Sequence, residues 1–176
     1  MRVLGIAGWS GSGKTTLLAD LIPLLVARGL RISTIKHAHH EFDVDKPGKD
    51  SYRHREAGAT EVLISSAKRF ALMHEHRGAI EPTLDELVAR LSAVDLVLVE
   101  GFKHENHAKI EVWRSEVGKP MLQPNDSNVI AVASDQPMPG LAVPVLDANN
   151  HVQIADFIIG WMAQPVVSGA RRGAAE

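Results

Sequence analysis

The sequence predicts an α/β protein with a mostly parallel sheet flanked by helices. Short apolar runs alternate along the chain with segments of helical periodicity, which is the pattern of β-α-β units. The segment 8–15, between the first run and the first helix, reads Gly-Trp-Ser-Gly-Ser-Gly-Lys-Thr, a full match to the phosphate-binding pattern G-x-x-x-x-G-K-[ST]. The expected fold class is therefore P-loop NTPase-like.

The N-terminal elements follow from apolar spacing and from the positions of glycine and proline. The first helix should end at Gly29, a natural helix C-cap, and bury a leucine stripe. A polar segment without periodicity, interrupted by Pro47 and Gly48, indicates a long loop. The expected elements are a strand at 2–7, a helix at 14–28, a strand at 31–36, a loop at 37–50 and a short helix at 51–57.

The middle of the chain departs from a plain parallel sheet. Two strand-like runs at 61–65 and 69–74 are joined by a tight turn, which predicts an antiparallel hairpin or small subdomain around residues 61–74. Thr83 and Glu86 form a capping box that should open a helix reaching about residue 91.

The remaining runs complete the sheet and its cover. The expected elements are strands at 95–100, 109–113, 129–133 and 143–146, and a final helix at 151–162. After Pro165 the chain is rich in small and polar residues, which predicts a disordered tail at 165–176. We therefore expect one P-loop domain at 1–164 with the hairpin as an insertion.

Composition excludes several classes of function. The 176 residues carry a net charge of −2, so no global field would hold nucleic acid or an anionic membrane. The absence of cysteine excludes a disulfide framework and thiolate metal sites. No apolar run approaches the length of a membrane span, and the chain starts directly in a strand. We expect a cytoplasmic protein without nucleic-acid or membrane partners.

The phosphate-binding pattern assigns the first site residues. Lys14 should reach the β- and γ-phosphates and is a candidate catalytic residue, and the Thr15 hydroxyl should ligate Mg²⁺. Trp9 is bulky for its position, and it either packs on a neighbouring strand or forms a stacking surface at the mouth of the site. The residues expected to bind a nucleoside di- or triphosphate are Gly8, Trp9, Ser10, Gly11, Ser12, Gly13, Lys14, Thr15 and Thr16.

A second nucleotide element follows the apolar run 96–99. Glu100 ends this run, and in phosphate-loop proteins such an acid belongs to the Mg²⁺ shell. We expect Glu100 to act with Thr15 at the metal and to be a candidate catalytic residue; the alternative is a buried strand that ends in a solvated acid. Lys103 then places a cation near the phosphates.

A third element is the apolar run 129–133 with Ser134 and Asp135 after it. A carboxylate at this place can accept hydrogen bonds from N1–H and the 2-amino group of guanine, which adenine does not offer. The same residues are equally compatible with a turn that simply starts with Ser-Asp. Both interpretations stay open at this point.

Several blocks along the chain form a combined pattern that is more specific than a phosphate loop alone. They are Gly8–Thr15, Ile35-Lys36-His37, His39-His40, Pro47–Ser51, Arg53, Ala57-Gly58, Asp95–Lys103 and Ala133–Asp135. In these blocks the chain resembles a known family, molybdopterin-guanine dinucleotide biosynthesis protein B (MobB), over roughly residues 2 to 162. The resemblance implies a homodimer that binds GTP with Mg²⁺ and is at most a weak GTPase. It also implies that the protein assists the guanylyltransferase that attaches GMP to molybdopterin, in molybdenum cofactor biosynthesis.

The resemblance also bears on Lys49 and Arg53, which lie in a positively charged stretch after the long loop. It favours a docking site for the phosphate of molybdopterin, because arginine grips phosphate bidentately. The alternative for these residues is a solvated helix face.

Two other functions remain open. A small-molecule kinase of the nucleoside-kinase type shares the phosphate loop and the strand that ends in Glu100. A metallochaperone GTPase would use the cluster of His37, His39 and His40. A polar loop whose histidines contact phosphate or solvent accounts better for that cluster, because the sequence offers no cysteine and no distant set of ligands.

Overall fold

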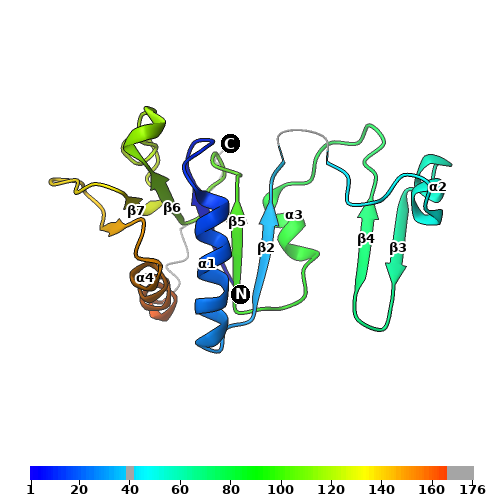
Figure 1. Ribbon diagram of the computed structural model, residues 1–176, viewed down its shortest axis with the longest axis horizontal. Coiled ribbons are helices and arrows are strands. Elements are labelled where there is room, and N and C mark those ends of the chain that lie inside the picture. The colour runs from blue at the N-terminus through cyan, green and yellow to red at the C-terminus, as the bar shows by residue number, and fades with distance from the viewer. Residues whose placement is uncertain (39–41, 166–176) are drawn as a thin grey trace, which may run out of the picture. The chain divides into compact units, whose positions relative to one another are not determined.

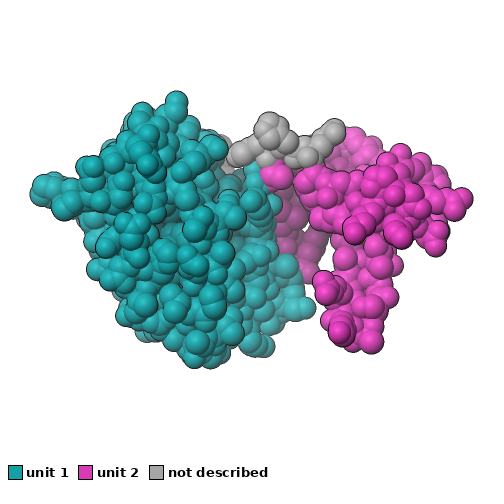
Figure 2. Space-filling model, in the orientation of Figure 1, with its two compact units in different colours: residues 1–37, 91–176 teal, residues 38–90 magenta. Residues whose placement is uncertain are grey.

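The computed structural model describes residues 1–38 and 42–165. The chain forms two compact units, drawn in different colours in Figure 2. Unit 1 comprises residues 1–37 together with the chain from residue 91 onward, and unit 2 comprises residues 38–90. No helix within the described ranges is both long and apolar enough to cross a membrane.

Unit 1 is built on a six-stranded sheet in the order β2-β5-β1-β6-β7-β8 (Figure 1). All five strand pairs are parallel, which confirms the predicted fold class. Parallel strands present their carboxyl ends at one edge of the sheet, where ligands of α/β proteins bind. The strands are β1 (Arg2–Ala7), β2 (Ile32–Lys36), β5 (Leu96–Glu100), β6 (Lys109–Trp113), β7 (Val129–Ser134) and β8 (Val145–Asp147).

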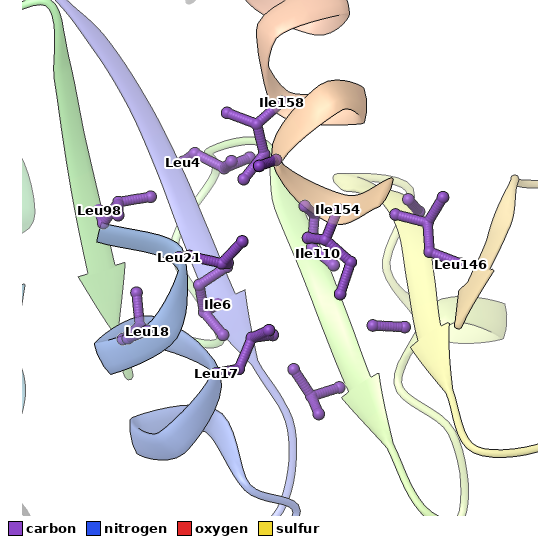
Figure 3. Packing of buried hydrophobic residues seen from close by; sticks show 14 of the residues in the cluster. Leu4, Ile6, Leu17, Leu18, Leu21, Leu98, Ile110, Leu146, Ile154 and Ile158 are labelled. Atoms are coloured by element: carbon purple, nitrogen blue, oxygen red, sulfur yellow. The ribbon is translucent and has the colours of Figure 1, made fainter. Parts of the chain in front are cut away.

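Helices α1 (Lys14–Ala27) and α4 (His151–Ala163) bury their apolar sides against one face of this sheet. Figure 3 shows Leu21 of α1 and Ile154 of α4 directed at side chains of β1 and β6. The expected leucine stripe of α1 is buried. The helix ends at Ala27 with Arg28 at its C-cap, and Gly29, expected to stop the helix, follows with a φ of 88°. This packing fixes the N-terminus of α1 against β1.

The opposite face of the sheet buries two charged side chains of β6. Lys109 donates hydrogen bonds to the Glu105 carbonyl (2.6 Å) and to Asp126 Oδ2 (2.8 Å). Glu111 accepts from the backbone N–H groups of Leu122 and Gln123 at 2.7 and 2.8 Å, while burial raises the pKa of its carboxyl group. These contacts hold the chain around 105 and 122–126 against the sheet, beside short 3-10 turns at Ser115–Val117 and Gln123–Asn125.

Unit 2 contains the predicted hairpin and two short helices. Strands β3 (Glu61–Ser65) and β4 (Phe70–His74) pair antiparallel around a tight turn, as expected. Its helices are α2 (Asp50–Glu56) and α3 (Leu84–Ala89). The capping box of α3 is confirmed, because Thr83 Oγ1 accepts from the Glu86 N–H and Glu86 Oε2 accepts from the Thr83 N–H.

Candidate phosphate and metal site

The phosphate loop lies at the carboxyl end of β1 and winds through three glycines with positive φ. Gly8, Gly11 and Gly13 have φ values of 140°, 83° and 86°. At Gly8 the need for glycine is also steric, because a Cβ there would lie 2.5 Å from the Val112 carbonyl oxygen. The loop therefore takes a backbone course that other residues would strain, and successive N–H groups can turn inward.

The start of α1 has the features of an anion site. Gly13 provides no side-chain cap, and the first turn of the helix contains no acidic residue. Helical geometry leaves the first N–H groups of such a helix without partners inside it. The Ser12 hydroxyl is buried without a hydrogen-bond partner among the described residues. These unpaired donors suit the phosphates of a nucleotide.

Lys14 lies within this loop and contacts its backbone. Its Nζ donates a 2.8 Å hydrogen bond to the Trp9 carbonyl oxygen. Burial lowers the pKa of the ammonium group, Lys103 and Lys36 lower it further, and Glu100 opposes them. Lys14 is therefore a partly desolvated cation whose charged form would be favoured by a bound phosphate.

Thr15 and Glu100 bring the two predicted nucleotide elements together. Thr15 Oγ1 donates a 2.8 Å hydrogen bond to Glu100 Oε1. The second carboxylate oxygen of Glu100 lies 3.6 Å from Lys36 Nζ, at the end of the neighbouring strand β2. A hydroxyl and a carboxylate oxygen at this spacing are hard oxygen ligands of the kind that Mg²⁺ prefers.

The turn after Glu100 is tightly constrained. Gly101 has a φ of 99°, and a Cβ there would lie 2.7 Å from the Cβ of His37. Phe102 has a positive φ of 48°, and its ring lies 4.8 Å from that of His37. The His37 N–H also donates to the Glu100 carbonyl at 2.8 Å. This close approach of two chain segments fixes the course of the chain directly after Glu100.

Trp9 and Lys103 lie together beside the loop. Lys103 Nζ is 4.5 Å from the centroid of the Trp9 ring, and the indole N–H donates to the Pro120 carbonyl at 2.7 Å. Both side chains line an open hollow of about 500 Å³ with residues 120–122 and 125–128. Trp9 thus packs on the chain at Pro120 and also lines the hollow, so both interpretations of this residue stay open.

Ser134 ends β7 and Asp135 follows it, at the same edge of the sheet. Ser134 is buried and its hydroxyl accepts from the Gln136 N–H at 3.0 Å, so this side chain stabilises its own turn. The Asp135 carboxylate accepts from the Ser115 N–H (3.2 Å) and hydroxyl (3.1 Å). Asp135 thus ties the end of β7 to the segment that follows β6.

Comparison with known proteins assigns the chain to a family. The family model "Molybdopterin guanine dinucleotide synthesis protein B" matches residues 3–135. The chain belongs to the MobB family. The chain is similar to two molybdopterin-guanine dinucleotide biosynthesis adapter proteins, and each match covers 91% of the chain. The protein from Escherichia coli K12 is 52% identical, and the match covers 93% of its length. The protein from Haemophilus influenzae Rd is 48% identical, and the match covers 89% of its length.

A solved structure of the MobB family agrees with the fold. The chain is similar to the crystal structure of molybdopterin-guanine biosynthesis protein B, with a TM-score of 0.70 and 28% identity. The match covers 90% of this chain and 99% of that one. The family resemblance inferred from the motifs is thereby confirmed.

Unit 2 of this MobB-family chain carries Lys49 and Arg53. Arg53 is 75% exposed and lies 4.0 Å from Asp50, and Lys49 is exposed at the N-cap of α2. Arg53 also lines a surface hollow of about 620 Å³ formed by α2 and Ala57. The geometry is compatible both with an anion-docking site and with a solvated helix face.

The loop before α2 is held by a partly buried arginine of the same unit. Arg55, 14% exposed, contacts Asp43 Oδ2 at 2.6 Å and Glu75 Oε1 at 3.4 Å. Asp45 Oδ1 accepts from the Ser51 hydroxyl at 2.9 Å, and its Oδ2 lies 4.0 Å from Arg55 Nε. Arg55 thus provides a positive charge next to both aspartates of the loop within unit 2.

The histidine cluster is only partly described. His37 packs on Phe102, whereas His39 and His40 lie outside the described residues. Within residues 1–38 and 42–165, no three or more His, Asp or Glu side chains gather as a possible metal site. The metallochaperone alternative depends on residues that the structure does not describe.

Three polar residues at the site were given no role in the sequence analysis. Lys36 contacts Glu100, Arg114 lies beside Gly13, and Asn149 accepts a hydrogen bond from Arg114. Lys36 ends β2, Arg114 follows β6, and Asn149 lies two residues after β8. The signal that could have identified them is positional: polar residues at the carboxyl ends of parallel strands meet at one edge of the sheet.

Proposed function

We propose that this protein is an adapter of molybdopterin-guanine dinucleotide biosynthesis that binds GTP with Mg²⁺ and assists a molybdenum cofactor guanylyltransferase. The similarity to two adapter proteins of that name supports the pathway. The observation that supports GTP with Mg²⁺ as the ligand is the uncapped N-terminus of α1 behind a glycine loop. It lies next to the contact between Thr15 and Glu100. Because GTP is abundant in the cytoplasm, we place the protein there.

In this proposal each residue of the phosphate site has one role. The loop N–H groups and Lys14 bind the phosphate oxygens, and Thr15 and Glu100 hold Mg²⁺ or its water ligands. Bound Mg²⁺ would offset the developing negative charge on the phosphates. Lys14 and Glu100 position the γ-phosphate and water, which supports weak hydrolysis at most, and an accessory rather than an enzymatic role.

Guanine selectivity is proposed for Asp135 with Ser134. The carboxylate of Asp135 stands at the carboxyl end of β7 and is partly exposed. Its two oxygens now accept hydrogen bonds from Ser115. When they release Ser115, they can accept instead from the N1–H and the 2-amino group of guanine. A site built to accept two hydrogen bonds discriminates strongly against a base that lacks the donors.

A second ligand, molybdopterin, is proposed for unit 2. The exposed cations Lys49 and Arg53 lie beside the hollow on α2, where a guanidinium can grip a phosphate group. Arg53→Ala should weaken binding of a pterin phosphate without changing GTP binding. Equal binding by the variant would assign these residues to a solvated face.

A homodimer is proposed from the apolar surface of unit 2. Leu63, Phe70 and Leu72 of the hairpin are 60, 71 and 52% exposed. A two-stranded hairpin is marginally stable alone, and large exposed apolar groups favour a protein partner. Phe70→Asp should shift the protein from dimer to monomer in light scattering. Val152→Asp on α4, also at an exposed apolar residue, should leave the dimer intact, and a wild-type monomer would contradict the proposal.

The whole proposal is tested by binding measurements with purified proteins. Calorimetry should show GTP binding that requires Mg²⁺ and exceeds ATP binding. The guanylyltransferase should then be retained by the immobilised protein, and GTP–Mg²⁺ should change the amount retained. Absence of GTP binding would refute the ligand, and absence of enzyme retention under all nucleotide conditions would refute the adapter role.

A further inference from the structure

The guanidinium of Arg114 lies against the phosphate loop. A Cβ placed on Gly13 would be 3.5 Å from Arg114 Nε and 3.9 Å from Nη2. Gly13 is the loop residue directly before Lys14 and forms the N-cap of α1. A guanidinium this close to an anion site is within reach of any phosphate that the loop binds.

The backbone of Arg114 is fixed at this place from both sides. It directly follows β6, whose register pairs Glu111 with Ala7 at the end of β1. The next residue, Ser115, is bonded through its N–H and hydroxyl to Asp135. The pairing of β6 with β1 and the contacts of Ser115 therefore fix the backbone from which the Arg114 side chain reaches the loop.

Arg114 has no carboxylate partner among the described residues, in contrast to Arg28, Arg31 and Arg55, which form ion pairs. Its polar contact is a 3.2 Å hydrogen bond from Nη2 to Asn149 Oδ1, a neutral amide in the loop after β8. Arg114 can therefore exchange its hydrogen bond to the neutral Asn149 amide for one to a phosphate in the loop at little cost in free energy.

The order of the strands places Arg114 along the nucleotide. Glu100 ends β5 on one side of β1, whereas β6 and then β7 with Asp135 follow on the other side. If the metal end of the nucleotide lies at Glu100 and the base at Asp135, as proposed above, Arg114 stands between them. The phosphate nearest the nucleoside lies at this intermediate position.

We propose that Arg114 binds the α-phosphate of the nucleotide in cis, on the opposite side of the loop from Glu100, and releases Asn149 when it does so. This inference rests on the proposed GTP site and adds a residue to it. Arginine suits this role because its planar donor fork binds two phosphate oxygens at once.

The test is a ligand series that separates the phosphates. GTP and GDP are titrated by calorimetry, and GMP and guanosine by NMR, into wild type, Arg114→Ala, Arg114→Lys and Lys14→Ala. Arg114→Ala should weaken GTP, GDP and GMP alike by about tenfold or more, the usual effect of losing a hydrogen bond to a charged group, and leave guanosine unchanged. Arg114→Lys should retain part of the affinity, and Lys14→Ala should affect GTP and GDP but spare GMP.

Lys119→Ala provides the matched control, because it removes one exposed positive charge from the segment that follows β6. It should bind every ligand as the wild type does. Wild-type GMP affinity in a folded Arg114→Ala variant would overturn the inference, and so would a loss confined to GTP and GDP. A wild-type protein that binds no guanine nucleotide would instead refute the proposed function.

Discussion

The Thr15 hydroxyl and the Glu100 carboxylate are joined by a 2.8 Å hydrogen bond across 85 residues of sequence. The pair exists because β1 and β5 are parallel neighbours, with Ile6 opposite Glu100 in the register. The phosphate loop and the acidic strand end are therefore one site in the folded chain.

Lys14→Ala should abolish tight GTP binding while the protein stays folded. The ammonium group donates to the loop carbonyl of Trp9, and Lys14 is only partly buried, so its loss removes a phosphate contact without opening a large cavity. Calorimetry should show an affinity loss of about 100-fold, the upper end for a charge-assisted contact. Lys68→Ala, at an exposed lysine of unit 2, is the control, and unchanged GTP affinity in folded Lys14→Ala would exclude this phosphate site.

Glu100→Gln should remove the dependence of GTP binding on Mg²⁺. A neutral amide is a much weaker ligand than a carboxylate for a hard divalent cation. GTP titrations with Mg²⁺ and with a chelator should give the same affinity in this variant and different affinities in the wild type. Glu116→Gln removes an exposed acid and should behave as the wild type; a persistent Mg²⁺ effect in Glu100→Gln would place the metal elsewhere.

Asp135→Asn should reduce the preference for GTP over ATP. One of its two acceptor oxygens becomes a donor, which opposes a donor of guanine. The ratio of the two affinities, measured by competition, should fall mainly through weaker GTP binding. Asp85→Asn on α3 is the control for the charge change, and equal GTP and ATP affinities in the wild type would remove the basis of this prediction.

Gly101→Ala should destabilise the fold more than Gly29→Ala, although the two glycines have similar φ values of 99° and 88°. At both positions the positive φ costs about 1–3 kcal/mol for a residue with a Cβ. At Gly101 the new methyl group also overlaps His37, whereas nothing lies within 4 Å at Gly29. Overpacking of this kind adds about 1–3 kcal/mol. Denaturant unfolding measures the difference, and equal losses would show that His37 moves aside freely.

The pKa of Asp43 should report the contact with Arg55. The Asp45 N–H, and then the Arg55 guanidinium, hold the pKa of the Asp43 carboxyl below its ordinary 3.8. Because the folded pKa is the lower one, the contact stabilises unit 2 above the unfolded pKa, and this stabilisation is lost as pH falls through the folded pKa. In Arg55→Gln a carbon-detected NMR titration should find the Asp43 pKa raised but still below 3.8, since the N–H bond remains. An unchanged pKa would show that the ion pair does not form in solution.

Local sequence signals predicted most of the fold. The phosphate loop, the capping box of Thr83 and the Gly29 cap each depend on residues a few positions apart, so the chain carries the whole signal. Apolar periodicity likewise located the strands and α1. The ends of elements moved by one or two residues, as in β8, which covers Val145–Asp147 rather than 143–146.

The parts of the site that escaped prediction depend on the order of strands in the sheet. Lys36 reaches Glu100 because β2 pairs with β5, and Arg114 reaches Gly13 because β6 lies next to β1. No local pattern encodes either neighbour. The role of the Ser134 hydroxyl in its own turn was hidden for a different reason, because a Ser-Asp pair after a strand suits both a turn and a ligand.

The parallel pairing of β2 with β5 has a consequence for the chain between them. A strand of five residues spans about 17 Å, so the chain must return that far from the carboxyl end of β2 to the amino end of β5. Residues 38–90 make up most of this return path. Parallel strands require such a long connection, because a tight turn can join only antiparallel neighbours. Unit 2 is thus the crossover of the sheet as well as a unit of its own. A shortened chain without it would still need a linker of about a dozen residues to keep β2, and with it Lys36, in place.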